Sequence, residues 1–185
     1  METRGRSADL DGGRRGFFNR GLFGFPNPVN EVAARTVAGG VVVMAVAAVA
    51  ADLPWMLIPL TYGFWARVLT GPRLSPLGLL ATRVIVPRLP VAERPTPGPP
   101  KRFAQAIGAF VTTSAVVVWV TAGWDVARWL VVLIAVAAFA ESAFGFCVGC
   151  RVFALLMRLG VIPTSVCEEC GDLGRRHPEL ARPAR

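Results

Sequence analysis

The sequence predicts an all-α membrane protein: a four-transmembrane-helix bundle with an interfacial amphipathic helix and a short cytoplasmic Cys-rich C-terminal segment. Three observations lead to this fold class. Apolar residues make up 54% of the 185 residues, and the mean hydropathy is +0.51. Only 17% of the residues are charged, against roughly 25% in an average soluble domain. The apolar residues also gather in runs of about 20, which is the length of a helix that crosses a bilayer.

Four apolar runs are predicted to span the membrane. They cover approximately residues 31–51, 53–70, 103–122 and 126–147. The second run is the weakest because it holds Pro54, Pro59 and Arg67, although proline is tolerated where neighbouring helices satisfy the freed backbone groups. At the start of the first run, the stretch FPNPVNE predicts Asn27 as the helix cap and Pro28 as the first helical residue.

The second and third runs are separated by a predicted cytoplasmic loop, residues 72–102. Within it, residues 74–88 mix leucine, valine and isoleucine with Arg83 and Arg88, directly after Arg73, and are too short to span. This pattern predicts an amphipathic helix lying in the membrane interface. The proline cluster at 95–100 predicts an extended linker rather than a helix.

The distribution of basic residues predicts the orientation of the bundle. Of the 20 Lys and Arg residues, six lie before or at the start of the first run, seven lie in or beside the central loop, and six follow the fourth run. Only Arg128 lies near the short turns that hold Asp52 and Asp125. The positive-inside rule therefore predicts a multi-pass plasma-membrane protein with cytoplasmic N- and C-termini.

The net charge of +8 raises the question of a nucleic-acid partner. Because the basic residues alternate with apolar runs, membrane lipid is the expected partner and nucleic acid is not. The predicted organisation has a basic, aromatic tail over residues 1–30, a membrane domain over 31–147 and a cytoplasmic tail over 148–185. The first tail lacks the apolar core and cleavage site of a secretory signal, so the first run is expected to be an uncleaved start-transfer helix.

Glu141 lies well inside the fourth run. An ionisable residue at that depth is costly and is a functional candidate by default. Its alternative role is structural, as the partner of an arginine on another helix such as Arg35 or Arg67.

All four cysteines lie near the C-terminus, as Cys147-x-x-Cys150 and Cys167-x-x-Cys170. The segment RVFALLMRLG between the pairs predicts a short amphipathic helix that ends at Gly160. In SVCEEC, a capping box predicts that Cys167 lies in the first turn of a second short helix. Because cytosolic reductants keep thiols reduced, stable disulfides are not expected on this side of the membrane.

Three interpretations of the cysteines remain open. Two dithiols can exchange electrons or sulfur, because one thiolate attacks and the second sulfur resolves the intermediate. The spacing also fits a four-thiolate zinc site, with Cys147, Cys150, Cys167 and Cys170 as ligands. Finally, cysteine can serve as a small buried apolar residue.

Several segments together resemble the DUF 4395 family of uncharacterised integral membrane proteins, common in actinobacteria. The segments are FPNPVNEVAARTVAG, GPRLSPLGLLATRVIVPRL, PGPPKRFAQAIGAF, FCVGCRVFALL and GVIPTSVCEEC. The resemblance covers roughly residues 25–172 and implies a small membrane protein of unknown activity. Because members are often encoded near thioredoxin-like proteins and rhodanese-type sulfurtransferases, it also favours thiol or sulfur chemistry at the four cysteines.

The preferred hypothesis is a cytoplasmic-face dithiol or sulfur-relay module that works with a thioredoxin-like or rhodanese-type partner. One alternative is a zinc-stabilised membrane scaffold that catalyses nothing. Another is a small transporter that uses Glu141. The sequence leaves open whether the chain is an enzyme.

Overall fold

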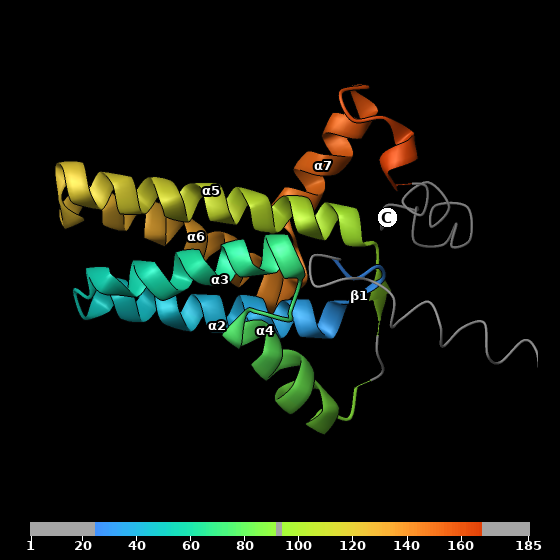
Figure 1. Cartoon of the computed structure of the whole chain (residues 1–185), viewed down its shortest axis with the longest axis horizontal. Helices are drawn as coiled ribbons and strands as arrows, with labels where there is room; N and C mark the ends of the chain where they lie inside the picture. Colours follow the sequence, from blue (N-terminus) through green and yellow to red (C-terminus); the bar gives the residue numbers. More distant parts are fainter. Residues whose placement is uncertain (1–24, 92–93, 168–185) are drawn as a thin grey trace, which may run out of the picture.

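The computed structural model describes residues 25–91 and 94–167, and its long helices lie side by side as a bundle (Figure 1). The elements in chain order are β1 Val29–Asn30, α2 Glu31–Ala50, η1 Pro54–Met56, α3 Leu57–Thr70, α4 Pro76–Leu79, η2 Leu80–Ile85, η3 Val86–Arg88, β2 Pro95–Thr96, α5 Gly98–Ala122, α6 Trp124–Phe144, α7 Val148–Arg158 and η4 Thr164–Cys167. The predicted all-α, membrane-type fold is therefore confirmed for the part of the chain that the structure describes.

Among the described residues, three helices are long and apolar enough to cross a membrane, namely α2, α5 and α6. The second predicted run forms the 3₁₀ turn η1 followed by α3, which is 14 residues long. Pro54 opens η1 and Pro59 lies in the first turn of α3, where a missing backbone N–H breaks no helical hydrogen bond. Figure 1 shows η1 and α3 running beside α2 along most of its length.

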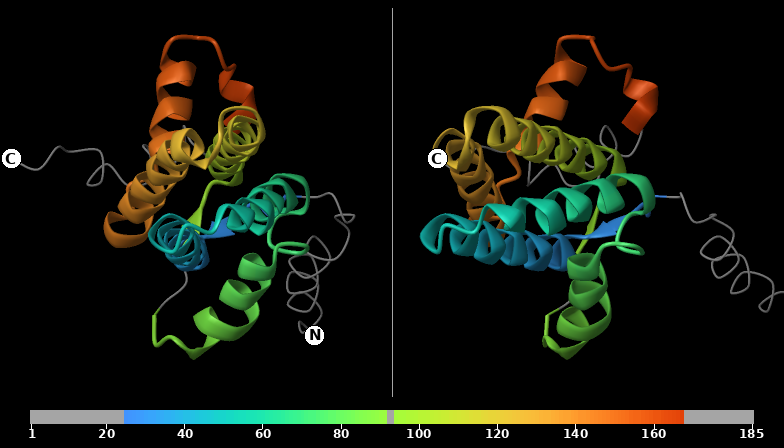
Figure 2. Two further views of the ribbon diagram at one scale, coloured as in Figure 1. Left: turned by 90° about the vertical axis from the view of Figure 1, so that its left-hand side faces the viewer. Right: turned by 60° about the vertical axis from the view of Figure 1, so that its left-hand side comes forward.

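Helix α6 packs against both α2 and α5, and α5 packs against α3 (Figure 2). Small residues occupy many of the helix contacts, beside larger ones such as Leu57, Leu60 and Phe64. In α2, α5 and α6, the alanines that are at most 1% exposed are Ala45, Ala48, Ala109, Ala115 and Ala127. Many other large apolar side chains point outward, among them Phe110, Val120, Trp129 and Phe144. Small residues between helices and large apolar residues outside are typical of a bundle surrounded by lipid.

The central loop differs from its prediction at its C-terminal end, where α5 begins five residues before the predicted run. Pro99 and Pro100 lie in its first turn, where proline removes only N–H groups that have no helical acceptor. Only Pro95–Thr96 remains extended, and it pairs antiparallel with Val29–Asn30. These backbone hydrogen bonds hold the start of α2 beside the C-terminal end of the central loop.

The cap of α2 is also different from the prediction. Asn30 is the N-cap, and its Oδ1 accepts a hydrogen bond from Val32 N at 2.9 Å. Asn27 instead accepts a hydrogen bond from Gly98 N at 2.8 Å, so it serves the first residue of α5.

Two helical segments leave the bundle at the same end and on opposite sides of it (Figure 1). One consists of α4, η2 and η3, which form consecutive helical turns over residues 76–88. The other is α7, which confirms the short helix predicted between the cysteine pairs, with Gly160 in the left-handed region just after it. Both run across the axis of the bundle.

Candidate functional site

The first cysteine pair lies where the chain turns from α6 into α7. Helix α6 ends at Phe144, three residues before the predicted end, because Gly145 adopts a left-handed conformation with φ +68°. The N–H groups of Gly145 and Phe146 donate to carbonyls of the last turn of α6, which closes that helix. The chain is then extended at Cys147, and α7 begins at the next residue.

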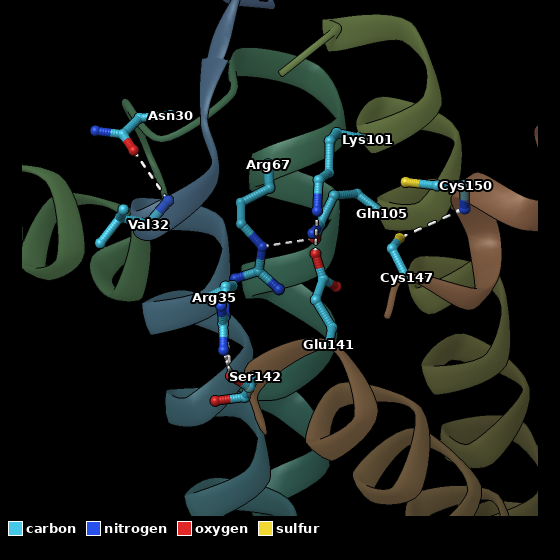
Figure 3. Close-up of polar contacts among 10 residues, drawn as sticks. All are labelled: Asn30, Val32, Arg35, Arg67, Lys101, Gln105, Glu141, Ser142, Cys147 and Cys150. Atoms are coloured by element: carbon cyan, nitrogen blue, oxygen red, sulfur yellow. Dashed lines mark hydrogen bonds and ion pairs between the residues drawn. The ribbon is translucent and has the colours of Figure 1, made fainter. Parts of the chain in front are cut away.

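Cys147 is the N-cap of α7. Its Sγ accepts a hydrogen bond from the backbone N–H of Cys150 at 3.4 Å, as the side-chain oxygen of a serine cap would do (Figure 3). The first turn of a helix presents unpaired N–H groups and the positive end of the helix dipole. Both features favour a thiolate over a thiol at this position.

Helix α7 holds the pair against the start of α5. Gly149 packs so closely on α5 that an added Cβ would lie 2.5 Å from Cα and Cβ of Ala104. One helical turn later, the buried ring of Phe153 packs against Phe103 at a centroid distance of 5.5 Å. Cys147 is consequently buried at 8% exposure, and Cys150 is partly buried.

A buried ion pair adjoins the two cysteines. Lys101, in the first turn of α5, donates from Nζ to Oε1 of Glu141 in the last turn of α6 at 2.5 Å. Their side chains are only 8% and 14% exposed. The sequence predicts Arg35 or Arg67 as the partner of Glu141, and the structure assigns Lys101 instead. The difference follows from the early start of α5, which moves Lys101 from the predicted loop into the bundle.

Arg67 lies on the other side of this pair and is 5% exposed. Its Nε donates to Oε1 of Gln105 at 2.7 Å, and its Nη1 donates to Oγ of Ser75 at 3.1 Å. The guanidinium also lies over the ring of Phe64, 4.6 Å from the centroid. Within the described residues its Nη2 is buried without a hydrogen-bond partner. Arg67 therefore adds a second buried cation at this end of the bundle.

Arg35 has a structural role at the end of α6. Its Nε and Nη2 donate to the carbonyl oxygen of Ser142 at 3.1 and 3.0 Å, and Nη2 also donates to that of Ala143 at 2.9 Å. These carbonyls belong to the last turn of α6, which has no helical donors for them. Arg35 thus fixes the position from which the chain turns toward Cys147 (Figure 3).

The pKa values of the two thiols are shifted in opposite directions. Hydrogen bonding with Cys150 lowers the pKa of Cys147, and the positive charge of Lys101 acts in the same direction, whereas burial and the charge of Glu141 oppose the shift. A hydrogen bond between the two side chains raises the pKa of Cys150, and burial and the negative charge on Cys147 raise it further. Cys147 therefore forms the first thiolate, and Cys150 keeps its proton. This division suits a nucleophile and a resolving thiol.

The second cysteine pair is described only in part, because Cys170 lies outside the described residues. Cys167 is the last residue of the 3₁₀ turn η4, rather than a residue in the first turn of an α-helix, and it is buried. It is disulfide-bonded, whereas Cys147 and Cys150 carry free thiols. The sequence-based expectation of no stable disulfide differs from the structure here.

Sequence reasoning found the cysteines, Glu141 and Arg67 but missed Lys101 and Gln105. One signal for Lys101 was present, since it is the only lysine among 20 basic residues. Lysine differs from arginine because its proton can be removed when the side chain is buried. Gln105 carries no comparable signal, because the sequence does not show that a glutamine near a helix start will accept a hydrogen bond from Arg67.

No curated protein and no solved structure matches the chain. The model of a family described as a domain of unknown function, DUF4395, matches residues 29–158. This range includes the ion pair and the first cysteine pair, and it ends before Cys167, so it is shorter than the resemblance seen in the sequence. Because the match covers more than half of the 185 residues, the chain belongs to the DUF4395 family.

Proposed function

We propose that this protein is a membrane-anchored dithiol that exchanges electrons or sulfur with a thioredoxin-like or sulfurtransferase partner on the cytoplasmic face. The observation that carries the proposal is the pair of free thiols at the N-terminus of α7. One sulfur caps the helix, and the other lies one turn later with a contrasting acidity. A thiolate beside a resolving thiol is the arrangement that thiol–disulfide exchange requires.

The proposal includes a four-span topology with both termini and the central loop in the cytoplasm. Helices α2, α5 and α6 would be spans by length and composition, and η1 with α3 would be the second span, inclined or in a locally thin bilayer. The end of the bundle that carries the cysteines also holds the basic central loop, so the positive-inside rule assigns it to the cytoplasm.

The two segments that cross the bundle axis support this placement. In α7, exposed apolar side chains recur at helical spacing on one side, at Val148, Val152, Leu155 and Leu159. In residues 76–88, Leu80 and Val84 are exposed beside arginines. Amphipathic helices of this kind lie in the headgroup region, with cationic side chains near anionic lipid. We therefore infer that both segments rest on the inner leaflet.

The alternatives have less support. A four-thiolate zinc site needs the thiol of Cys167, which is disulfide-bonded. A transport role for Glu141 has to break the buried ion pair with Lys101. The attack of Cys147 on a disulfide needs no rearrangement of this pair.

The experiment that tests the function is disulfide trapping in cells. In the Cys150→Ser variant a partner joined to Cys147 cannot be released, so mixed disulfides should accumulate on non-reducing gels. The matched control is Cys147→Ser, which removes the nucleophile and should trap nothing. Equal trapping by the two variants, or none by either, would refute the exchange function.

The topology has a separate test. Reporter fusions at residues 90 and 180 should be active with a cytosolic reporter and silent with one that needs export. Activity of the exported reporter at either position would overturn the proposed orientation.

A further inference from the structure

The buried pair Lys101–Glu141 has no evident need to be ionic if its role is only to hold α5 against α6. Replacing a buried ion pair by well-packed apolar residues is often neutral or stabilising, so a buried pair is weak evidence for a purely structural role. This pair also lies beside the only two free thiols among the described residues, and each of its members interacts electrostatically with both. The ion pair is therefore placed to influence the chemistry of those thiols.

The charges around the dithiol can be assigned element by element. Lys101 faces it from α5 and Glu141 from α6, with Arg67 of α3 behind them. Arg151 of α7 lies over the ring of Phe146, at 5.3 Å from its centroid. From α2, Glu31 and Arg35 approach Gly145, where Arg35 is bound to the carbonyls of α6.

The buried part of this set carries one excess positive charge. Lys101 and Arg67 are cations and Glu141 is an anion, and Nη2 of Arg67 is left without a partner in the described structure. A thiolate on Cys147 supplies the missing negative charge. The cluster is thus neutral in the state in which Cys147 is ready to attack a disulfide, and a buried cluster is most stable when its charges balance.

We propose that Lys101 and Glu141 divide the acid–base work of the dithiol: Lys101 stabilises the attacking thiolate of Cys147, and Glu141 accepts the proton of Cys150 when Cys150 resolves the mixed disulfide. The inference rests on the proposed dithiol function and assigns roles to two further residues. Both groups lie close enough to the sulfurs to interact with them electrostatically, and Figure 3 shows them side by side at the cysteine end of α6.

The reaction balances as follows. The Cys147 thiolate attacks one sulfur of a disulfide R–S–S–R, forms a mixed disulfide and releases one thiolate R–S⁻. Cys150 then gives its proton to the Glu141 carboxylate, directly or through one water, and its sulfur attacks Sγ of Cys147. The products are the Cys147–Cys150 disulfide and a second thiolate, which receives a proton from Glu141 or solvent. Two electrons pass from the dithiol to the substrate disulfide, which is the oxidant.

Formation of the mixed disulfide makes the second step possible. It removes the negative charge on Cys147, which is one of the causes that hold the proton on Cys150. The excess positive charge of the cluster then favours a thiolate on Cys150. Glu141 of α6 is an acidic residue whose charge acts on Cys150, so it is suited to take the proton at the moment of attack.

The two residues of one ion pair should therefore have opposite kinetic signatures. The full chain is reconstituted in lipid nanodiscs with Cys167→Ser and Cys170→Ser in every variant, and it is mixed with 4,4′-dithiodipyridine. Each attack releases one coloured thiopyridone, so the attack by Cys147 and the closure by Cys150 are seen as two phases. Rates are measured across a range of pH together with the melting temperature of each variant.

Glu141→Gln should leave the first phase unchanged or faster and slow the second by about 10-fold or more near neutral pH, with the defect shrinking as pH rises. Lys101→Gln should slow the first phase by about 10-fold and move its half-maximal pH upward, as expected for a pKa raised by about one unit. Lys101→Arg keeps the charge and should restore the first phase.

A structural role predicts a different pattern, since both substitutions break the same ion pair. Equal slowing of both phases by both variants, in step with the melting temperature, would overturn the proposal, as would two unchanged phases. If single variants fold poorly, the double variant Lys101→Met, Glu141→Leu removes the unpaired charge and should fold with both phases slow; normal phases in it would overturn the proposal. If the unsubstituted pair releases no thiopyridone, the dithiol function itself fails.

Discussion

At the scale of single residues, Cys147 combines two roles that are usually separate. Its sulfur closes the first turn of α7, and the same sulfur is the candidate nucleophile. A helix cap is held in one rotamer by its hydrogen bond, so the nucleophile is oriented before a partner arrives. The hydrogen bond also stabilises the charged form of the sulfur.

The contrast between the two thiols can be measured by alkylation. With the second pair replaced by serine, Cys150→Ser leaves Cys147 and preserves a hydroxyl donor beside it. Its rate of alkylation by iodoacetamide should be half-maximal at a pH below the ordinary thiol value of about 8.5. In Cys147→Ser, the influence of Cys147 on Cys150 is lost but burial still raises the pKa of Cys150, so its half-maximal rate should come at a higher pH than that of Cys147. The reverse order would contradict the assignment of nucleophile and resolving thiol.

The stabilisation of the C-terminal end of α6 by Arg35 can be measured by substitution. Arg35→Met keeps most of the aliphatic chain and removes the hydrogen bonds to the carbonyls of Ser142 and Ala143. The free energy of unfolding should fall by about 1.5–3 kcal/mol, the range for hydrogen bonds to a charged group. The control is Arg128→Met, which breaks an exposed ion pair with Asp125 and should cost about 0–1 kcal/mol. Titration with sodium dodecyl sulfate measures both, and equal losses would count against a capping role.

Lys101 shows why parts of the site escape sequence reasoning. The cysteine spacing and the depth of Glu141 are visible in the sequence, because each is unusual for a membrane helix. The partner of Glu141 is not visible, since it depends on where α5 begins. Lys101 is adjacent to Arg102, and only the helical phase decides which of the two side chains turns inward.

At the scale of elements, the position of α7 depends on one close contact with α5. Gly149 allows the backbones to approach, and an alanine there would collide with Cα and Cβ of Ala104 at 2.5 Å. Backbone atoms cannot move aside as a flexible side chain can. The contact between α5 and α7 is therefore what keeps the dithiol beside Lys101.

Gly149→Ala should push α7 away from α5 and lower stability by about 1–3 kcal/mol, as overpacking does. The half-maximal pH for Cys147 alkylation should rise, because the sulfur moves away from Lys101. The matched control is Gly40→Ala, whose Cβ would meet only the flexible end of Leu77 at 2.9 Å. Ala is favoured over Gly inside a helix by about 1 kcal/mol, so the control should be close to neutral. If the two variants behave alike, the α5–α7 contact does not position the pair.

The helices themselves were largely predictable from sequence. The runs of apolar residues mark α2, α5 and α6 to within a few residues, because span length is set by the bilayer. The ends were less predictable. The proline cluster at 95–100 predicts a linker, yet proline fits the first turn of a helix, and the Gly98 N–H of that turn donates to Asn27, which lies in a distant part of the sequence.

At the scale of the whole molecule, the bundle brings the start of α2, the end of α3, the start of α5 and the end of α6 to one end (Figure 1). This alternation follows from two antiparallel hairpins, α2 with α3 and α5 with α6, which the central loop connects. It places two buried cations, one buried acid and two thiols at that end, beside the segments proposed to rest on the lipid surface. A partner in the cytoplasm would then meet the dithiol at the membrane surface.

The central claim is that Cys147 and Cys150 form a reversible dithiol–disulfide couple. The most direct measurement is the state of the thiols in protein that is purified without reductant, equilibrated with defined ratios of reduced and oxidised glutathione, and only then quenched with an alkylating agent. Mass spectrometry should show Cys147 and Cys150 losing and regaining their thiols together, as one two-electron transition. If the two thiols persist across the whole range, and the purified chain carries about one zinc ion, the account is wrong and the metal-stabilised scaffold is correct.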